Sequence, residues 1–499
     1  MVQTVISDAP TILRVQPPRA HALDALRGLA ILAMIFSGTI RFRILPAWMY
    51  HAQNPPPTHV FNKAIAGLTW VDVVFPLFLF TMGAAIPFAL SRRLQRGWSP
   101  PKIIVSIFKR GFLLAAFAIV VQHFRPFTIN SKPTTMTWIL ALLGFGLLFL
   151  MFSNWIAFRK WARYRRVFPL VGWVVAIALI TQLSYGGKGF DLNRSDPILM
   201  VLANMAVWGS LAWLFTRFNI RFRLGILVFL LALQFSAGSE GWVKTLWSSS
   251  PVPWLFQFYY LKYLFIVIPG TIAGDFILQR SQHRLLPQTA QDSEFQEHYD
   301  HYEEDWQDGR VQQQRWLILG SMLMLCFVLL VGLQSRTVFL TLLMCGAIAA
   351  ATWPLFAKLQ DETGFLIQRL YQWGVFWLFL GLCFEPFQGG IHKDPSTYSY
   401  YFVTTAIAHF LLIALTILID YFHQKKACQF LIDSGRNPLI AYVAFGNLLW
   451  PLLHLTGLED RILELTNQPV LGVLKGVAYT LPIALLTVYF TRIKLFWRI

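Results

Sequence analysis

Long apolar segments recur along almost the whole chain and restrict it to one fold class. About 20 mostly apolar helical residues cross the hydrocarbon core of a bilayer. Segments of this kind lie at 23–41, 69–90, 103–123, 134–154, 167–184, 197–216, 222–238, 258–279, 315–334, 337–357, 366–386, 402–422, 436–456 and 470–491. Strands of a membrane barrel would alternate polar and apolar residues, and these segments do not. We predict an all-α, polytopic transmembrane bundle of about 11 to 14 helices, because two pairs of segments have very short links.

The composition supports a membrane protein and argues against a nucleic-acid-binding one. Of 499 residues, 56% are hydrophobic and 13% are charged, and the mean hydropathy is +0.53. Soluble domains are far more polar. The net charge of +18 would suit nucleic acid, but the basic residues lie in short connections between apolar segments. We therefore expect the lipid bilayer as a partner and no nucleic acid.

The positions of the basic residues predict the orientation of the bundle. Cytoplasmic connections of membrane proteins carry an excess of lysine and arginine. If the N-terminus is inside, the basic clusters fall on the inner side, at 92–102, 159–166, 217–223, 425–426 and 492–498. The outer connections carry few basic residues. We therefore predict that both termini are cytoplasmic.

One long hydrophilic connection divides the chain. It carries eight of the 24 acidic residues and is typical of a solvated linker. We predict a cytoplasmic N-terminal segment at 1–22, an N-terminal membrane bundle at 23–279, a hydrophilic cytoplasmic linker at 280–314 and a C-terminal membrane bundle at 315–499. His298 and His301 lie in the linker without tight ligand spacing, so we expect no metal.

Charged residues at the predicted inner side are candidates for binding an anion, because charge in lipid is costly unless it is paired or faces a polar cavity. Asp24 and Arg27 are three residues apart and form either a local ion pair or an anion contact. Arg436 and Asn437 open an apolar segment, where Asn437 either caps the helix or helps to receive phosphate. Lys262 is a weaker candidate, because a lysine near the outer interface usually extends to water.

Polar residues gather in the connection between the apolar segments 366–386 and 402–422. The stretch GGIHKDPSTYSYYF contains His392, Lys393 and Asp394 among hydroxyl-bearing side chains. We interpret this cluster as the rim of a polar pocket on the outer side. Asp72, at the outer end of the second segment, either orients a nearby histidine or caps the helix.

The first outer loop contains the stretch WMYHAQNPPPTHVFN, residues 48–62, with two histidines. An imidazole can remove a proton near neutral pH. A lone loop histidine is usually incidental, however, so the spacing alone leaves both His51 and His59 as weak candidates for catalysis.

Several stretches occur together in the order found in the heparan-alpha-glucosaminide N-acetyltransferase family, and the chain resembles its bacterial relatives in the transmembrane acyltransferase superfamily. These stretches are LDALRGLAILAMIFSG, HAQ, GLTWVDVVFPLFLFTMGAAIPFAL, IPGTIAGDFIL, GGIHKDPSTYSYYF and SGRNPLIAYV. The chain departs from the lysosomal member in two places. Ser37 and Gly38 stand where that protein has an asparagine, and the loop after His51 carries a proline-rich insertion.

The resemblance implies an acetyltransferase that uses cytosolic acetyl-CoA and acetylates a sugar or glycan on the extracytoplasmic side. It implies that His51, followed by Ala52, is the catalytic residue in the N-terminal bundle. His59 is the alternative, and we expect Asp72 to orient the histidine. The remaining candidates for binding the substrate or the donor are Asp24, Arg27, Lys262, His392, Lys393, Asp394, Arg436 and Asn437.

Some points stay open. The sequence does not separate O- from N-acetylation, or direct transfer from an acetyl-histidine intermediate. We expect the bacterial inner membrane as the location, and a homodimer is an assembly that the sequence leaves open. The alternative function is a transporter of a glycan or lipid-linked intermediate without acyl transfer.

Overall fold

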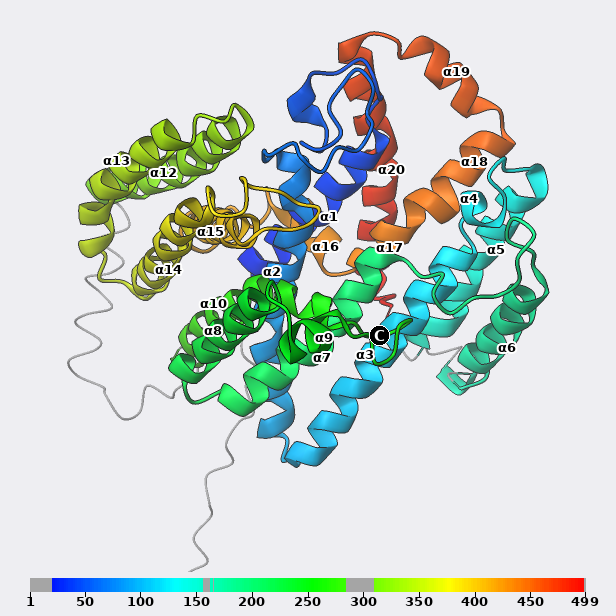
Figure 1. Cartoon of the computed structure of the whole chain (residues 1–499), viewed down its shortest axis with the longest axis horizontal. Coiled ribbons are helices and arrows are strands. Elements are labelled where there is room, and N and C mark those ends of the chain that lie inside the picture. Colours follow the sequence, from blue (N-terminus) through cyan, green and yellow to red (C-terminus); the bar gives the residue numbers. More distant parts are fainter. Residues whose placement is uncertain (1–19, 156–161, 165, 284–308, 498–499) are drawn as a thin grey trace, which may run out of the picture.

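The described part of the chain is built from helices and the connections between them (Figure 1). The computed structural model describes residues 20–155, 162–164, 166–283 and 309–497. In chain order the elements are α1 (His21–Thr39), η1 (Ala47–Met49), α2 (Trp70–Gln95), α3 (Pro100–His123), α4 (Pro126–Ile129), α5 (Thr135–Phe152), η3 (Ala162–Tyr164), α6 (Val167–Gln182), α7 (Pro197–Thr216), α8 (Ile220–Ser236), α9 (Trp242–Ser248), η4 (Phe258–Tyr263), α10 (Leu264–His283), α12 (Gly309–Gln334), α13 (Val338–Ala357), α14 (Glu362–Phe384), α15 (Tyr398–Thr416), η6 (Ile417–Tyr421), α16 (Gln429–Gly435), α17 (Pro438–Ala444), η7 (Phe445–Leu449), α18 (Trp450–Leu455), α19 (Leu458–Leu465) and α20 (Pro469–Arg492).

The prediction of an all-α polytopic bundle is confirmed. Within the described ranges, 11 helices or continuous helix runs are long and apolar enough to cross a membrane. Helices also occupy the other three predicted segments, as α6, α8 and α14, but α6 and α8 have only 16 and 17 residues. The predicted orientation of the termini stays a prediction.

The division into two bundles and a linker also stays a prediction. Most of the predicted linker, with His298 and His301, falls outside the described residues, as does most of the predicted N-terminal segment. Helix α10 continues to His283 and α12 begins at Gly309. The helices therefore extend into both ends of the predicted linker.

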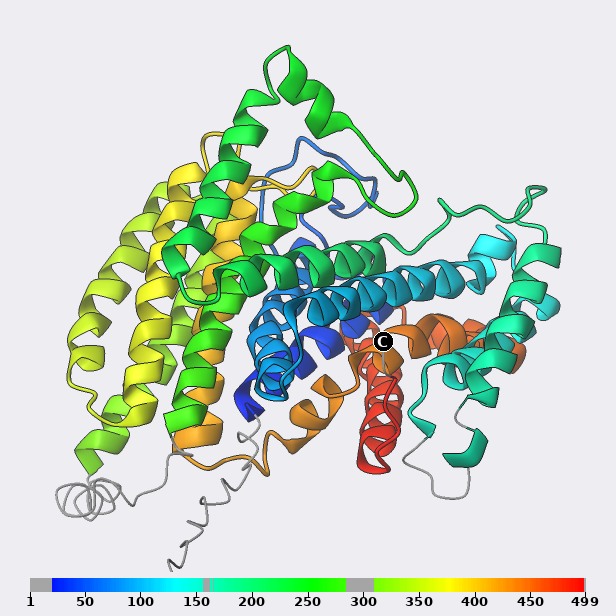
Figure 2. The same ribbon diagram turned by 90° about the horizontal axis from the view of Figure 1, so that it is seen from below.

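Helices α1 and α2 lie between two groups of helices. Figure 1 shows α12 and α13 at one edge of the bundle and α5 and α6 at the other. Helix α2 packs against α1 and α10, while α15 packs against α2, α10 and α14. The segment before α2 and the segment before α15 meet at one end of the bundle, at the top of Figure 2. Residues far apart in the sequence therefore form one polar surface there.

Close packing of backbones fixes α1 against α16. Cβ atoms added at Gly28 and Gly435 would overlap the backbone oxygens of Leu431 and Asp24, respectively. Such pairs of small residues let membrane helices approach closely, where van der Waals contact replaces the hydrophobic effect as the driving force. The contact also holds Arg27 beside the end of α16, because its guanidinium donates to Gly435 O at 3.4 Å.

The substitution Gly435→Ala should destabilise the bundle, because the added methyl group meets rigid backbone. We expect a loss of about 1–3 kcal/mol, typical of overpacking, measured as a lower unfolding temperature of the purified protein in detergent. The matched control is Gly320→Ala in α12, where an added Cβ meets nothing within 4 Å. Equal melting of the two variants would contradict the proposed backbone contact.

Candidate active site

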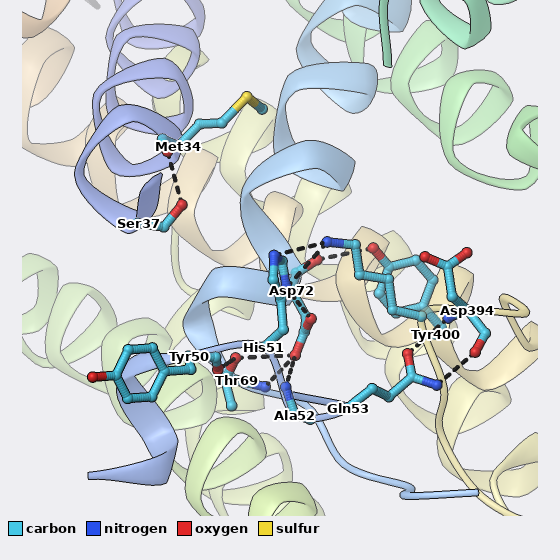
Figure 3. Close-up of polar contacts among 11 residues, drawn as sticks. Met34, Ser37, Tyr50, His51, Ala52, Gln53, Thr69, Asp72, Asp394 and Tyr400 are labelled. Carbon is cyan, nitrogen blue, oxygen red and sulfur yellow. Dashed lines mark hydrogen bonds and ion pairs between the residues drawn. The ribbon is translucent and has the colours of Figure 1, made fainter. Parts of the chain in front are cut away.

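The carboxylate of Asp72 joins the start of α2 to the loop between α1 and α2. Its Oδ2 atom accepts hydrogen bonds from Thr69 N at 3.1 Å, Thr69 Oγ1 at 3.0 Å and Ala52 N at 3.1 Å. Its Oδ1 atom pairs with His51 Nδ1 at 2.7 Å (Figure 3). Asp72 is only 2% exposed. The two predicted roles, helix capping and histidine orientation, are therefore both present in one side chain.

The bond to Asp72 decides which nitrogen of His51 carries hydrogen. An ionised carboxylate only accepts hydrogen bonds, so Nδ1 is the donor. In the neutral imidazole this leaves Nε2 with a lone pair that can accept a proton. The side chain of His51 is 38% exposed, so a molecule outside the bundle can reach it. No group of three or more His, Cys, Asp or Glu that could hold a metal occurs in the described ranges.

Lys393 approaches His51 from the connection between α14 and α15. Its Nζ atom lies 3.1 Å from His51 Nδ1 and 3.4 Å from His51 Nε2. Burial lowers the pKa of Lys393, while the negative charges of Asp72 and Asp394 oppose this shift. The site therefore combines an imidazole, a carboxylate and an ammonium group.

The side chain of Gln53 holds the Lys393 segment against the loop between α1 and α2. Gln53 Nε2 donates to Asp394 O at 2.5 Å, and Asp394 N donates to Gln53 Oε1 at 2.9 Å. Gln53 is 4% exposed. Gly67 N donates to Ile391 O at 2.9 Å, which adds a second link between the two segments. Sequence reasoning missed Gln53, although its place in the HAQ stretch was a signal.

Two other predicted residues, His392 of the Lys393 segment and Lys262 of η4, are also buried. His392 is buried, its Nδ1 lies 3.1 Å from Gly390 O, and its Nε2 has no hydrogen-bond partner in the described structure. Lys262 is 1% exposed and its Nζ lies 3.1 Å from the centroid of the Tyr259 ring. Its ammonium interacts electrostatically with Asp394. Lys262 therefore lies inside the protein beside the Lys393 segment and does not extend to water, contrary to the interpretation that we favoured from the sequence.

His59 occupies a different place from His51. Its Nε2 accepts a hydrogen bond from Arg43 N at 3.1 Å, and its ring packs edge-on against Phe42 and Tyr50. No hydrogen bond in the described structure joins His59 to Asp72. The structure thus brings His51 and not His59 to the carboxylate.

Ser37 stands at the place of the family asparagine but does not bind His51. Its hydroxyl donates to Met34 O at 2.7 Å, one turn earlier in α1. Figure 3 shows this bond on α1, apart from the contacts of His51. Ser37 therefore offers no replacement for an amide in the site.

The predicted binding residues of α1, α16 and α17 contact other parts of the protein, away from His51. Arg27 pairs with Asp24 at 3.3 Å and also donates to Thr81 O at 3.2 Å, so the ion-pair alternative is present. Arg436 pairs with Asp433 at 3.3 Å. Asn437 occupies the N-cap position of α17, but its side chain donates to Leu495 O at 2.8 Å and caps no helix. None of these contacts reaches the His51 site.

Two further arginines lie near Arg27 and were missed from the sequence. Arg110 of α3 interacts electrostatically with Arg93 of α2 and with Arg27 of α1. Arg93 donates to Ser106 Oγ at 2.5 Å. Three helices therefore place positive charge together at the end of the bundle opposite Asp72.

Two cavities of about 450 Å³ each lie beside the end of α1. Both are lined by Gly38, Phe445 and Trp450, and neither is lined by His51 or Asp72. Phe42, at the rim of the first cavity, stacks on Tyr50 with a centroid distance of 5.4 Å. The first cavity therefore adjoins the loop that carries His51.

Comparison with known proteins assigns the chain to a family. A family model described as a domain of unknown function, DUF5009, matches residues 19–277. The chain belongs to the DUF5009 family. This match includes His51 and Asp72 but ends before Lys393.

The DUF5009 chain is also similar to curated acetyltransferases over part of its length. It is 34% identical over 107 residues to the heparan-alpha-glucosaminide N-acetyltransferase of Homo sapiens. The aligned stretch covers 21% of this chain and 14% of the human protein. The protein of the same name from Mus musculus is 30% identical over 114 residues, covering 23% and 15%. The resemblance seen in the sequence is thus confirmed, while the match spans only a small part of these relatives.

The substitution Asp72→Asn should loosen the loop between α1 and α2, because an amide presents one acceptor oxygen where four donors now converge. An unsatisfied buried donor costs about 1–3 kcal/mol. We expect faster amide hydrogen exchange at Ala52 and Thr69, measured by mass spectrometry. Asp460→Asn, at an exposed position in α19, should leave that exchange unchanged. Identical protection in both variants would show that Asp72 does not organise the loop.

Proposed function

We propose that this protein is a membrane acetyltransferase that moves the acetyl group of acetyl-CoA to a hydroxyl or amine of a sugar or glycan acceptor. The observation that carries the proposal is the 2.7 Å pair of His51 and the buried Asp72. A histidine held in one tautomer by a carboxylate is a recurrent device of acyl transfer. The partial similarity to the two curated acetyltransferases supports the same chemistry.

His51 acts through Nε2 in this proposal. In direct transfer, Nε2 takes the proton of the acceptor as the acceptor oxygen or nitrogen attacks the thioester carbon. In a two-step reaction, Nε2 attacks that carbon first and carries the acetyl group covalently. Asp72 orients the ring and stabilises the positive charge that develops on it in both cases.

The arginine group of Arg27, Arg93 and Arg110 is the proposed binding site for the phosphates of CoA. Guanidinium groups bind phosphate through several hydrogen bonds at once. Arg27 contacts Thr81, nine residues after Asp72 in α2, which is about 14 Å at the rise of an α-helix. The pantetheine arm of CoA can bridge this distance. In this proposal Asp24 positions Arg27, while Arg436 and Asn437 shape the neighbouring end of α16 and α17.

The acceptor binds on the His51 side. His392, Lys262 and Asp394 supply polar groups beside His51 in this proposal. The excess of basic residues at the opposite end supports an extracytoplasmic His51 and a cytosolic donor. We propose a location in a bacterial inner membrane, which the resemblance to bacterial relatives supports.

The substitution His51→Ala should lower acetyl transfer at least about 100-fold, because a positioned acid-base group contributes that much or more. The assay incubates the purified protein with acetyl-CoA and with glucosamine or methyl glucoside, which supply an amine or only hydroxyls. It measures released CoA thiol and the acetylated sugar by mass spectrometry.

The companion variant His59→Ala keeps the pair of His51 and Asp72 and should lose far less activity. A large loss in His59→Ala with full activity in His51→Ala would reassign the catalytic residue. Transport of the sugar without release of CoA thiol would favour the transporter alternative.

A further inference from the structure

Lys393 places its ammonium group against the ring of His51, where a lysine with a purely structural role is not expected. Its Nζ contacts both ring nitrogens of His51. Because His51 Nδ1 donates to Asp72, only Nε2 can accept a hydrogen bond from the ammonium group. A positive charge at this place opposes protonation of the imidazole. The contact therefore disfavours the state that His51 must enter when it acts as a base.

The contact is imposed by the fold. His51 and Lys393 are 342 residues apart in the chain. The two hydrogen bonds between Gln53 and the Asp394 backbone fix the residue next to Lys393. Behind it, Glu385 Oε1 accepts from Ile391 N at 3.2 Å and pairs with Arg336 at 2.5 Å. The approach of Lys393 to His51 is thus built by several polar contacts.

Charged groups from three segments face Lys393. Asp72 belongs to α2, His51 to the first outer loop, and Asp394 to the same connection as Lys393. Lys262 interacts electrostatically with Asp394. Burial lowers the pKa of Lys393 against the opposing effect of the two carboxylates. The ammonium can therefore release a proton more easily than an exposed lysine.

We propose that Lys393 is a second catalytic residue, which protonates the departing CoA sulfur and recovers its proton from His51. The proposal rests on the acetyltransferase function proposed above. It assigns a reaction step to a residue that lies outside the matched family segment.

The step balances as follows. The acceptor oxygen or nitrogen forms a bond to the thioester carbon, and its proton passes to His51 Nε2. The carbon–sulfur bond then breaks, and sulfur leaves with the bonding electron pair. Lys393 transfers one ammonium proton to this sulfur and becomes a neutral amine. The proton on His51 Nε2 passes to Lys393 Nζ across the present 3.4 Å contact, which restores both residues.

Repulsion between two positive charges favours transfer of a proton from Lys393 to sulfur. When His51 holds the proton of the acceptor, an ammonium and an imidazolium lie together beside the carboxylate of Asp72. Loss of one proton from Lys393 to sulfur relieves this excess charge. The same contact that disfavours protonated His51 at rest therefore promotes completion of the reaction.

The test compares three variants of the full-length protein with acetyl-CoA and glucosamine. Lys393→Met keeps an unbranched side chain without charge and should lower kcat at least about 100-fold, with little change in KM for acetyl-CoA. Lys393→Arg keeps the charge but does not release a proton in proteins, so it should remain strongly impaired. Lys63→Met, at an exposed position in the first outer loop, should behave as wild type.

The pH profile supplies a readout that a structural role would not alter. Wild-type kcat should fall as pH rises through the pKa of Lys393, which lies below the ordinary lysine value. Lys393→Met should lose this alkaline limb. A monodisperse elution profile and an unchanged melting temperature would show that both variants at position 393 are folded.

Gln53→Glu tests the positioning of Lys393 without removing its amine. The carboxylate cannot donate to Asp394 O, so the segment should shift and kcat should fall while KM for acetyl-CoA stays constant. Full activity of this variant would count against the proposed positioning by Gln53.

The outcomes separate the two proposals. An active wild type with an equally active Lys393→Met overturns the relay and leaves the acetyltransferase proposal standing. Full activity of Lys393→Arg also overturns the relay, because charge alone would then suffice. A wild type that releases no CoA with glucosamine or methyl glucoside contradicts the acetyltransferase proposal and the relay with it.

Discussion

The site depends on one buried carboxylate at the start of a membrane helix. Asp72 accepts four hydrogen bonds from Thr69, Ala52 and His51. A buried charge is stable only when such donors compensate it, and the N-terminal end of α2 adds favourable electrostatics. Because two of the donors, Ala52 N and His51 Nδ1, come from the loop, the loop must close over α2 before the carboxylate is satisfied. Folding of the loop and orientation of His51 are therefore one event.

Helix α2 connects the two chemically distinct ends of the bundle. Its first turn holds Asp72, its middle presents Thr81 O to Arg27, and its last turns carry Arg93. A rigid helix keeps these points at fixed separation, and α2 lies in the interior with most of its residues buried. An acetyl donor that binds the arginines with one end would thus place its other end at a defined distance from His51.

The sequence predicted features that depend on residues close together in the chain. The fourteen apolar segments all became helices, and the ion pair of Asp24 and Arg27 follows from a spacing of three residues. The contact of His51 with Lys393 joins positions 342 residues apart, which no local pattern reveals. Asn437 shows the same limit. Its side-chain amide was expected to cap a helix, but it donates a hydrogen bond to Leu495 O. Lys262 was misplaced because burial depends on packing from distant helices.

The charges at the site explain why His51 and Lys393 should act as a pair. At rest, one ammonium faces one close carboxylate, Asp72, with Asp394 farther along the same connection. A proton gained by His51 would leave two cations beside Asp72 in a partly buried setting, where charge interactions are stronger than in water. A site built only for proton uptake would place a second carboxylate against the imidazole. Placing an ammonium there instead makes proton uptake at Nε2 favourable only when a proton can leave elsewhere. In the proposed reaction, this couples attack by the acceptor to departure of the thiol.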